Sequence, residues 1–138
     1  MIRIAVALVA VATSATAQQA PMTFEFGKSL PLAAGQWSYA ATATGSVARF
    51  GGYLSLLCDR PTRTMTISRP GAPVGAITII TDMQTRTLPP HGRISAYDPL
   101  LDAIAFSRGR FLVTGGGGGP IAVPNRPEAA RAIENCRN

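Results

Sequence analysis

The fold class is decided by residues 53–69, which read YLSLLCDRPTRTMTISR. In the first half of this stretch, Leu54, Leu56 and Cys58 recur at a period of two, which is the alternation of a half-buried strand. In the second half, methionine and isoleucine alternate with hydroxyl-bearing residues in the same way. The Asp-Arg-Pro sequence between the halves is typical of a turn. The stretch therefore predicts two strands joined by a short connection.

Further strands are expected on both sides of this stretch. Trp37, Tyr39 and Ala41 alternate with polar or small residues, and residues 76–81 form a β-branched run that suits a pleated surface. Glycine- and proline-rich turns separate the segments at intervals of about ten residues. The pattern predicts a mainly β fold, a small antiparallel β-sandwich or barrel, which occupies residues 36–138 as a single domain.

The composition fits one small domain. The chain has 138 residues, of which 46% are hydrophobic and 14% charged, and its 14 glycines and 11 prolines favour short elements. No run reaches the ~20 apolar residues of a membrane-spanning helix. The 13 basic and 7 acidic side chains give a formal net charge of +6, yet the arginines are spread along the chain and are not interleaved with aromatics as in nucleic-acid grooves. We therefore expect a solvated basic surface, no nucleic-acid partner and no membrane span.

Residues 1–17 have the pattern of a signal peptide. A single arginine precedes an apolar run too short to span a bilayer, and Ala15-Thr-Ala17 is the small-x-small motif that signal peptidase accepts. Cleavage between Ala17 and Gln18 is expected to release the protein into the periplasm, with residues 18–35 as an extended N-terminal segment. An N-terminal core strand or helix is the alternative.

An internal helix and a hairpin are expected in the last third of the chain. Asp98 followed by proline is typical of a helix start. Apolar residues then recur along one helical face, and Gly109 is suited to end the helix. Residues 110–114 and 120–124 have the composition of strands, and the five glycines between them that of a flexible hairpin tip.

A final helix is expected after the hairpin. Asn125 and Glu128 have the spacing of a capping box, with Asn in place of Ser or Thr. The apolar face of the helix is spaced by three and four residues and comprises Ala129, Ala130, Ile133 and Cys136. We expect this face to dock on the sheet.

The two cysteines of the chain, Cys58 and Cys136, are both expected to point inward, one from a strand and one from the final helix. In an exported protein such a pair persists as a disulfide. Two unrelated buried thiols are the alternative, and no Cys-x-x-Cys spacing indicates redox activity. We therefore predict a disulfide that fastens the final helix to the sheet.

Few residues are candidates for binding or chemistry. Arg108 and Arg110 flank a glycine and form a candidate anion-binding pair, although the same residues also fit an ordinary helix-to-strand turn. His91 lies in a Pro-Pro-His-Gly turn and would need a carboxylate such as Asp98 to act as a base. No nucleophile elbow, metal-ligand spacing or phosphate loop is present. We therefore expect no catalytic residue, no metal site and no cofactor.

Three stretches of the C-terminal half, residues 98–111 (DPLLDAIAFSRGRF), 123–124 (VP) and 128–137 (EAARAIENCR), resemble small uncharacterised exported proteins of alphaproteobacteria. The resemblance also takes in Trp37 and the Cys58-Asp-Arg60 segment, and so spans most of the mature chain. A looser similarity extends to invasion-associated locus B proteins, which are also small, exported and β-rich but have a different cysteine arrangement. The resemblance implies an exported β-rich domain and no particular activity.

The pattern favours a non-catalytic periplasmic binding or interaction protein of the cell envelope. Its expected partner is an unidentified envelope protein or an anionic envelope polymer, which a basic surface would attract. One alternative is a small exported hydrolase that uses His91. Another is an inhibitor of an exported protease, which inserts a loop or residues 18–35 into the cleft of its target.

Overall fold

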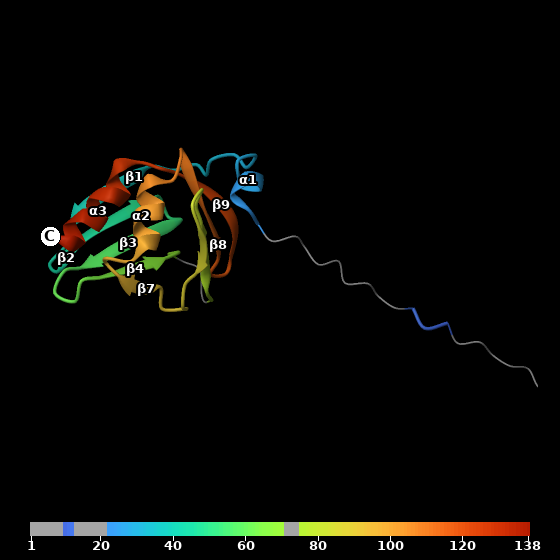
Figure 1. The fold of residues 1–138 in the computed structure, drawn as a ribbon, viewed down its shortest axis with the longest axis horizontal. Helices are drawn as coiled ribbons and strands as arrows, with labels where there is room; N and C mark the ends of the chain where they lie inside the picture. The colour runs from blue at the N-terminus through green and yellow to red at the C-terminus, as the bar shows by residue number, and fades with distance from the viewer. Residues whose placement is uncertain (1–9, 13–21, 71–74) are drawn as a thin grey trace, which may run out of the picture.

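The computed structural model of the protein describes residues 10–12, 22–70 and 75–138 (Figure 1). The predicted cleavage site and nearly all of the predicted signal peptide lie outside these residues. The elements follow one another as α1 (Phe24–Gly27), β1 (Trp37–Ala41), β2 (Gly45–Phe50), β3 (Leu54–Asp59), β4 (Thr64–Ser68), β5 (Ile77–Ile80), β6 (Thr85–Thr87), β7 (Arg93–Ser95), α2 (Pro99–Phe106), β8 (Arg110–Gly115), β9 (Gly118–Pro124) and α3 (Pro127–Arg137).

The strands form two antiparallel sheets. One sheet has the order β1-β2-β3-β4-β7 and the other the order β6-β5-β8-β9. Helices α2 and α3 lie together over one face of the five-stranded sheet (Figure 1). Two open sheets that share a core form a sandwich-like arrangement. The predicted mainly β fold with an internal helix and a C-terminal helix is therefore confirmed. Of the two predicted forms, the structure has the sandwich and not the barrel.

The core is built from the side chains that alternate inward along the strands. In β3, Leu54, Leu56 and Cys58 are fully buried, as their period-two spacing predicts. From the second sheet, Phe111 and Val113 of β8 enter the same cluster, together with apolar residues of α2 and α3. One contiguous core therefore unites both sheets and both helices.

Helix α3 docks on the five-stranded sheet by a stripe of small residues. Its buried side chains are Ala129, Ala132, Ile133 and Cys136. The predicted face includes Ala130, which is only half-buried, and omits Ala132, which is fully buried because a helical stripe is spaced by three, four and seven residues. Below the helix, β2 buries Ser46 and Ala48, whose small side chains allow a close approach. Because these side chains are small, they give no strong apolar alternation, and β2 is therefore difficult to predict from the sequence.

The predicted start of α2 is confirmed and that of α3 is wrong. Asp98 caps α2 by accepting a hydrogen bond from the backbone N–H of Leu100 at 2.9 Å. Helix α3 begins one residue later than a cap at Asn125 requires, because proline occupies its first position and Arg126 becomes the capping residue, without a side-chain hydrogen bond. Asn125 instead donates through Nδ2 to two backbone carbonyls at the end of α2, those of Ala105 and Ser107, at 3.0 and 2.6 Å.

A disulfide joins Cys58 of β3 to Cys136 of α3, as predicted, with the Cα atoms 5.5 Å apart. It fastens the last turn of the helix to β3, the central strand of the five-stranded sheet. No helix among residues 10–12, 22–70 and 75–138 is long and apolar enough to cross a membrane.

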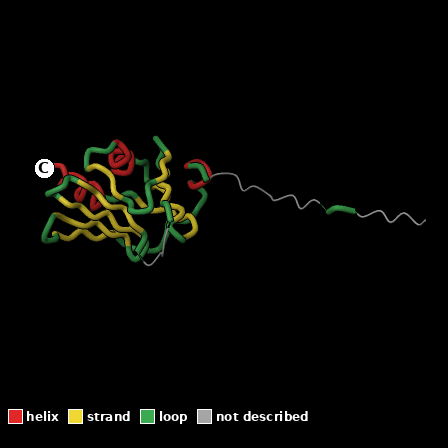
Figure 2. The backbone as a smooth tube through the Cα atoms, turned by 90° about the horizontal axis from the view of Figure 1, so that it is seen from below, coloured by secondary structure: helices red, strands yellow, loops and turns green. Residues whose placement is uncertain are grey.

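The N-terminal segment covers the second face of the four-stranded sheet. The prediction of an extended chain over residues 18–35 is wrong for Phe24–Gly27, which form the single helical turn α1. This segment brings Met22, Phe24 and Leu30 against an apolar cluster centred on Leu112 of β8, which would otherwise face water. Figure 2 shows α1 beside that sheet, at the end of the fold opposite to the C-terminus.

Candidate functional site

The turn between β3 and β4 presents two arginines, Arg60 and Arg63. The backbone N–H of Arg63 donates to the carbonyl oxygen of Arg60 at 3.1 Å, and Arg63 has a φ of 52°, in the left-handed region that side chains other than glycine rarely adopt. Among the described residues it is the one non-glycine residue with a positive φ. Backbone strain of this kind persists where the surrounding structure enforces it and is concentrated at functional sites.

The two guanidinium groups converge on one oxygen atom. Arg60 Nη2 and Arg63 Nη1 each donate to the main-chain oxygen of Asn138 at 2.8 Å, and Arg63 Nη1 also donates to the carbonyl oxygen of Cys136 at 3.2 Å. The two nitrogens are thus separated by no more than twice that 2.8 Å distance. Two cations focused on one oxygen reproduce the arrangement in which proteins hold a phosphate or carboxylate group.

The same contacts cap the C-terminal end of α3. The last carbonyls of a helix have no partner within the helix, and cations near them are favourable because of the helix dipole. A capping role explains why Arg60 and Arg63 are held in place. It leaves most of their N–H groups free for another ligand, because each guanidinium carries five donors.

These arginines border a hollow of about 470 Å³ at the end of the five-stranded sheet. Its lining comprises Thr42, Ala43, Thr44, Gly45, Arg60, Pro61 and Arg63. We call it the Arg60–Arg63 hollow. Its walls come from two neighbouring turns, β1–β2 and β3–β4, so its shape depends on the register of three adjacent strands.

A second hollow, of about 460 Å³, adjoins the first along the outer face of the sheet and shares Thr44 with it. Most of its other lining side chains carry hydroxyl groups or charge: Asp59, Thr62, Thr64, Thr66 and Arg93. The carboxylate of Asp59 accepts a hydrogen bond from Thr62 Oγ1 at 2.8 Å. The combined surface holds three arginines against one acidic residue, and its threonine hydroxyls both donate and accept hydrogen bonds.

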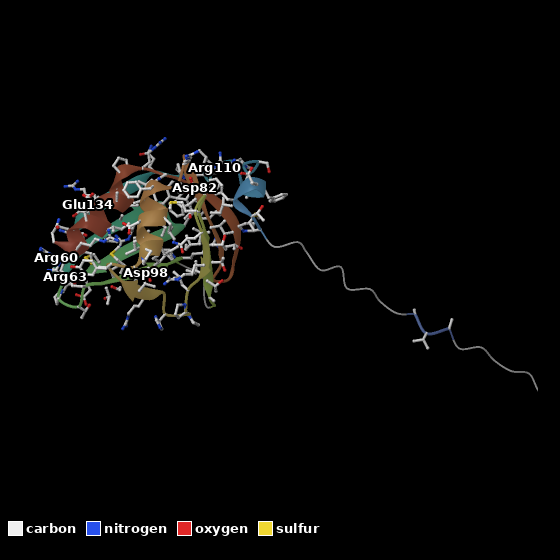
Figure 3. All side chains as sticks on the ribbon, viewed as in Figure 1. Arg60, Arg63, Asp82, Asp98, Arg110 and Glu134 are labelled. Carbon is white, nitrogen blue, oxygen red and sulfur yellow. A yellow bond between two sulfur atoms is a disulfide. The ribbon has the colours of Figure 1, made fainter. Side chains whose placement is uncertain are left out.

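The predicted anion-binding pair, Arg108 and Arg110, lies at the other end of the molecule. Figure 3 shows Arg60 and Arg63 at the end of the fold where Figure 1 marks the C-terminus, and Arg110 far from them. Arg110 Nη1 donates to the carbonyl oxygens of Leu30 at 2.6 Å and of Gly27 at 3.2 Å, so it anchors the N-terminal segment. The side chain of Arg108 is 93% exposed, with Nε 3.7 Å from a carboxylate oxygen of Asp82. Anion binding by this pair stays a prediction.

His91 and Asp98, the residues of the alternative hydrolase hypothesis, form their hydrogen bonds with other partners. His91 is exposed, and its Nδ1 accepts a hydrogen bond from the backbone N–H of Arg93 at 3.0 Å, within one turn. Asp98 accepts two hydrogen bonds from Arg86, at 2.6 and 2.5 Å. The hydrogen bond from Arg86 holds the pKa of Asp98 below its ordinary value, which suits a structural ion pair.

In the sequence, Arg60 belongs to a predicted turn and to the Cys58-Asp-Arg60 segment of the resemblance, and nothing singles out Arg63. Two arginines three residues apart in one turn are a weak local signal. The partner that makes them converge, Asn138, lies more than seventy residues away in the chain. Within the described part of the chain, no group of three or more His, Cys, Asp or Glu residues is placed to hold a metal ion.

Comparisons with protein families, with curated proteins and with solved structures find no significant match to this chain.

Proposed function

We propose that this is a non-catalytic binding protein of the cell envelope, exported to the periplasm, whose Arg60–Arg63 hollow holds an anionic group of an envelope polymer. The observation that carries the proposal is the convergence of the two guanidinium groups on one oxygen position beside a hydroxyl-lined hollow. Phosphate, sulfate and carboxylate groups match the planar fork of arginine. The neighbouring threonines suit the hydroxyl groups of a sugar backbone.

Rigidity favours binding at this hollow. Cys58 lies two residues before Arg60, and Cys136 two residues before Asn138, so the disulfide fixes both sides of the arginine cluster. A site that is already ordered loses less conformational entropy when its ligand binds. The disulfide therefore serves the binding geometry as well as the stability of the domain.

Export is supported by two independent features. The first is the signal-peptide pattern of residues 1–17 with its small-x-small motif. The second is the disulfide, since such bonds persist in oxidising compartments such as the periplasm. A basic protein in that compartment meets the phosphate and carboxylate groups of envelope polymers at close range.

The test is the binding of the mature chain to a sulfated polysaccharide, dextran sulfate, with inorganic polyphosphate as a second probe. We expect Arg60→Gln with Arg63→Gln to weaken binding about tenfold or more, since each lost charge-assisted hydrogen bond contributes about 1.5–3 kcal/mol. Binding of the unaltered protein should weaken as salt is raised. Because the double variant also loses helix caps, the exposed single variant Arg60→Gln is measured beside it, at a temperature where both are folded.

The matched control removes two other exposed arginines, with Arg49→Gln and Arg131→Gln. This control loses the same charge but keeps the hollow. Equal losses of affinity in the two double variants would show general charge attraction and would refute a specific site. Retained affinity after substitution of Arg60 and Arg63 would refute it too.

A further inference from the structure

A third hollow, of about 310 Å³, lies at the other end of β1, where α3 begins. Its lining includes Gly35, Gln36, Trp37, Phe50, Arg126 and Glu128. Strand β1 runs from Trp37 to Ala41, and the Arg60–Arg63 hollow begins at Thr42, so the length of the strand separates the two. We call this third hollow the Trp37 pocket. Its volume is at the lower end of the range for small-molecule sites.

The indole of Trp37 is a fixed wall of this pocket. Its Nε1–H donates to the carbonyl oxygen of Pro124 at 2.7 Å. The ring centroid lies 5.6 Å from that of Phe50 and 6.4 Å from that of Phe111, in tilted arrangements. Trp37 nevertheless remains only partly buried. A locked aromatic ring that still borders a hollow is suited to contact the apolar face of a ligand.

Glu128, which lines the same pocket, carries an unsatisfied acceptor. Its Oε2 atom is buried and has no hydrogen-bond partner in the structure. No basic side chain of residues 22–70 or 75–138 forms an ion pair with this carboxylate. The first-turn position of Glu128 in α3 is favourable for a negative charge, but it supplies no donor for Oε2. A buried polar atom without a partner is costly and calls for a donor.

We propose that the Trp37 pocket binds a saccharide ring. Sugar hydroxyls donate hydrogen bonds to Glu128 and accept them from Arg126 and Gln36, while the C–H face of the ring packs on Trp37. A simple cation would fit the carboxylate but meet Arg126, and a simple anion would meet Glu128. A ring with hydroxyls on its edge and an apolar face satisfies all of these groups at once.

The saccharide site goes beyond the proposed anion site and is tested separately from it. Trp37 is the single tryptophan of the chain, so its fluorescence reports on the pocket alone. The mature protein is titrated with glucose, N-acetylglucosamine and glucosamine at millimolar concentrations, and saturation-transfer NMR identifies which sugar protons contact the protein. We expect a saturable change in emission, with saturation transfer to the protons of one ring face.

The decisive variant is Glu128→Gln, and its matched control is Glu134→Gln. Glu134 lies on the same helix but is exposed to solvent, toward the C-terminal end (Figure 3). We expect Glu128→Gln to weaken sugar binding about tenfold, as the loss of a hydrogen bond to a charged group predicts, and Glu134→Gln to leave it unchanged. If Glu128→Gln unfolds, Gln36→Ala on the exposed rim is the second variant, with a smaller loss expected.

Three outcomes would overturn the saccharide site. The first is the absence of any change in emission and of saturation transfer with all three sugars. The second is equal weakening by Glu128→Gln and Glu134→Gln. The third is equal binding of putrescine and glucosamine with no binding of glucose, which would indicate a site for cations. Inorganic polyphosphate carries no sugar ring, so its binding, and the loss of that binding in Arg60→Gln with Arg63→Gln, reports on the proposed anion site alone. Failure of the saccharide site and failure of the anion site are therefore distinguishable.

Discussion

Removal of the disulfide by Cys58→Ala with Cys136→Ala is expected to destabilise the protein by about 4.5 kcal/mol. The two cysteines are 78 residues apart in the chain. The chain-entropy relation for a closed loop of that length gives this value at 25 °C. A domain of this size has a free energy of unfolding of about 5–15 kcal/mol, so the tether accounts for a large share.

The loss should appear first at the end of α3. Ala129 and Ala132 bury little apolar area, and Ile133 is the one large side chain that the helix contributes to the core. After the substitution, the last turn is held by side-chain hydrogen bonds, such as that of Tyr97 Oη to the carbonyl oxygen of Arg137 at 3.1 Å. Some of these bonds are exposed and others part-buried, and a typical hydrogen bond contributes only about 0.5–1.5 kcal/mol. We therefore expect α3 to open locally while the strands stay protected.

Two measurements check this expectation. Urea unfolding followed by circular dichroism should show a midpoint lower by about 1.5–4.5 M, given the usual dependence of stability on urea. Hydrogen exchange under native conditions should show lost protection at residues 133–137 and retained protection in β3 and β4. Glu134→Ala, which changes an exposed residue of α3 and keeps the tether, is the control.

An unchanged urea midpoint would refute the entropic reasoning. Intact protection of residues 133–137 in the double variant would show that packing alone holds the helix. Simultaneous loss of protection in α3 and the strands would show that the helix has no separate opening step.

Two further predictions concern the ion pair of Asp98 and the packing of Gly45. Asn caps helices as well as Asp does, so Asp98→Asn isolates the pair with Arg86 and should cost about 1 kcal/mol at neutral pH. Because the pKa of Asp98 is lowered in the folded protein, this stabilisation is complete above the pKa of the unfolded chain and is lost as pH falls through the lower folded value. Urea unfolding at neutral and acid pH should therefore show the difference between the two proteins vanish in acid, and a difference that persists there would contradict the assignment. Gly45→Ala should destabilise the protein by about 1–3 kcal/mol, because a Cβ at this position would lie 2.5 Å from the carbonyl oxygen of Cys58. Thermal unfolding measures the effect, and an unchanged Tm would mean that the strand shifts freely.

Local patterns in the sequence were sufficient for most of the strands, both longer helices and the cysteine pair. Alternation along β3 and β4 follows from the geometry of a pleated strand, in which neighbouring side chains point to opposite faces. The cap at Asp98 follows from the need of the first helical N–H groups for an acceptor. These features depend on residues close together in the chain, so they are readable without the fold.

The partner of Arg63 and the surroundings of Glu128 were decided by the tertiary structure alone. Arg63 meets Asn138 because the disulfide and the stripe of small residues dock α3 at one register on β2 and β3. Trp37 and Glu128 line one pocket because the start of β1 and the start of α3 lie together in the folded chain. Such convergence depends on the packing and register of segments far apart in the sequence, and no local periodicity encodes it. The sequence by itself determined the kind of elements and the inward face of most of them, and the tertiary structure decided which side chains from distant segments lie together.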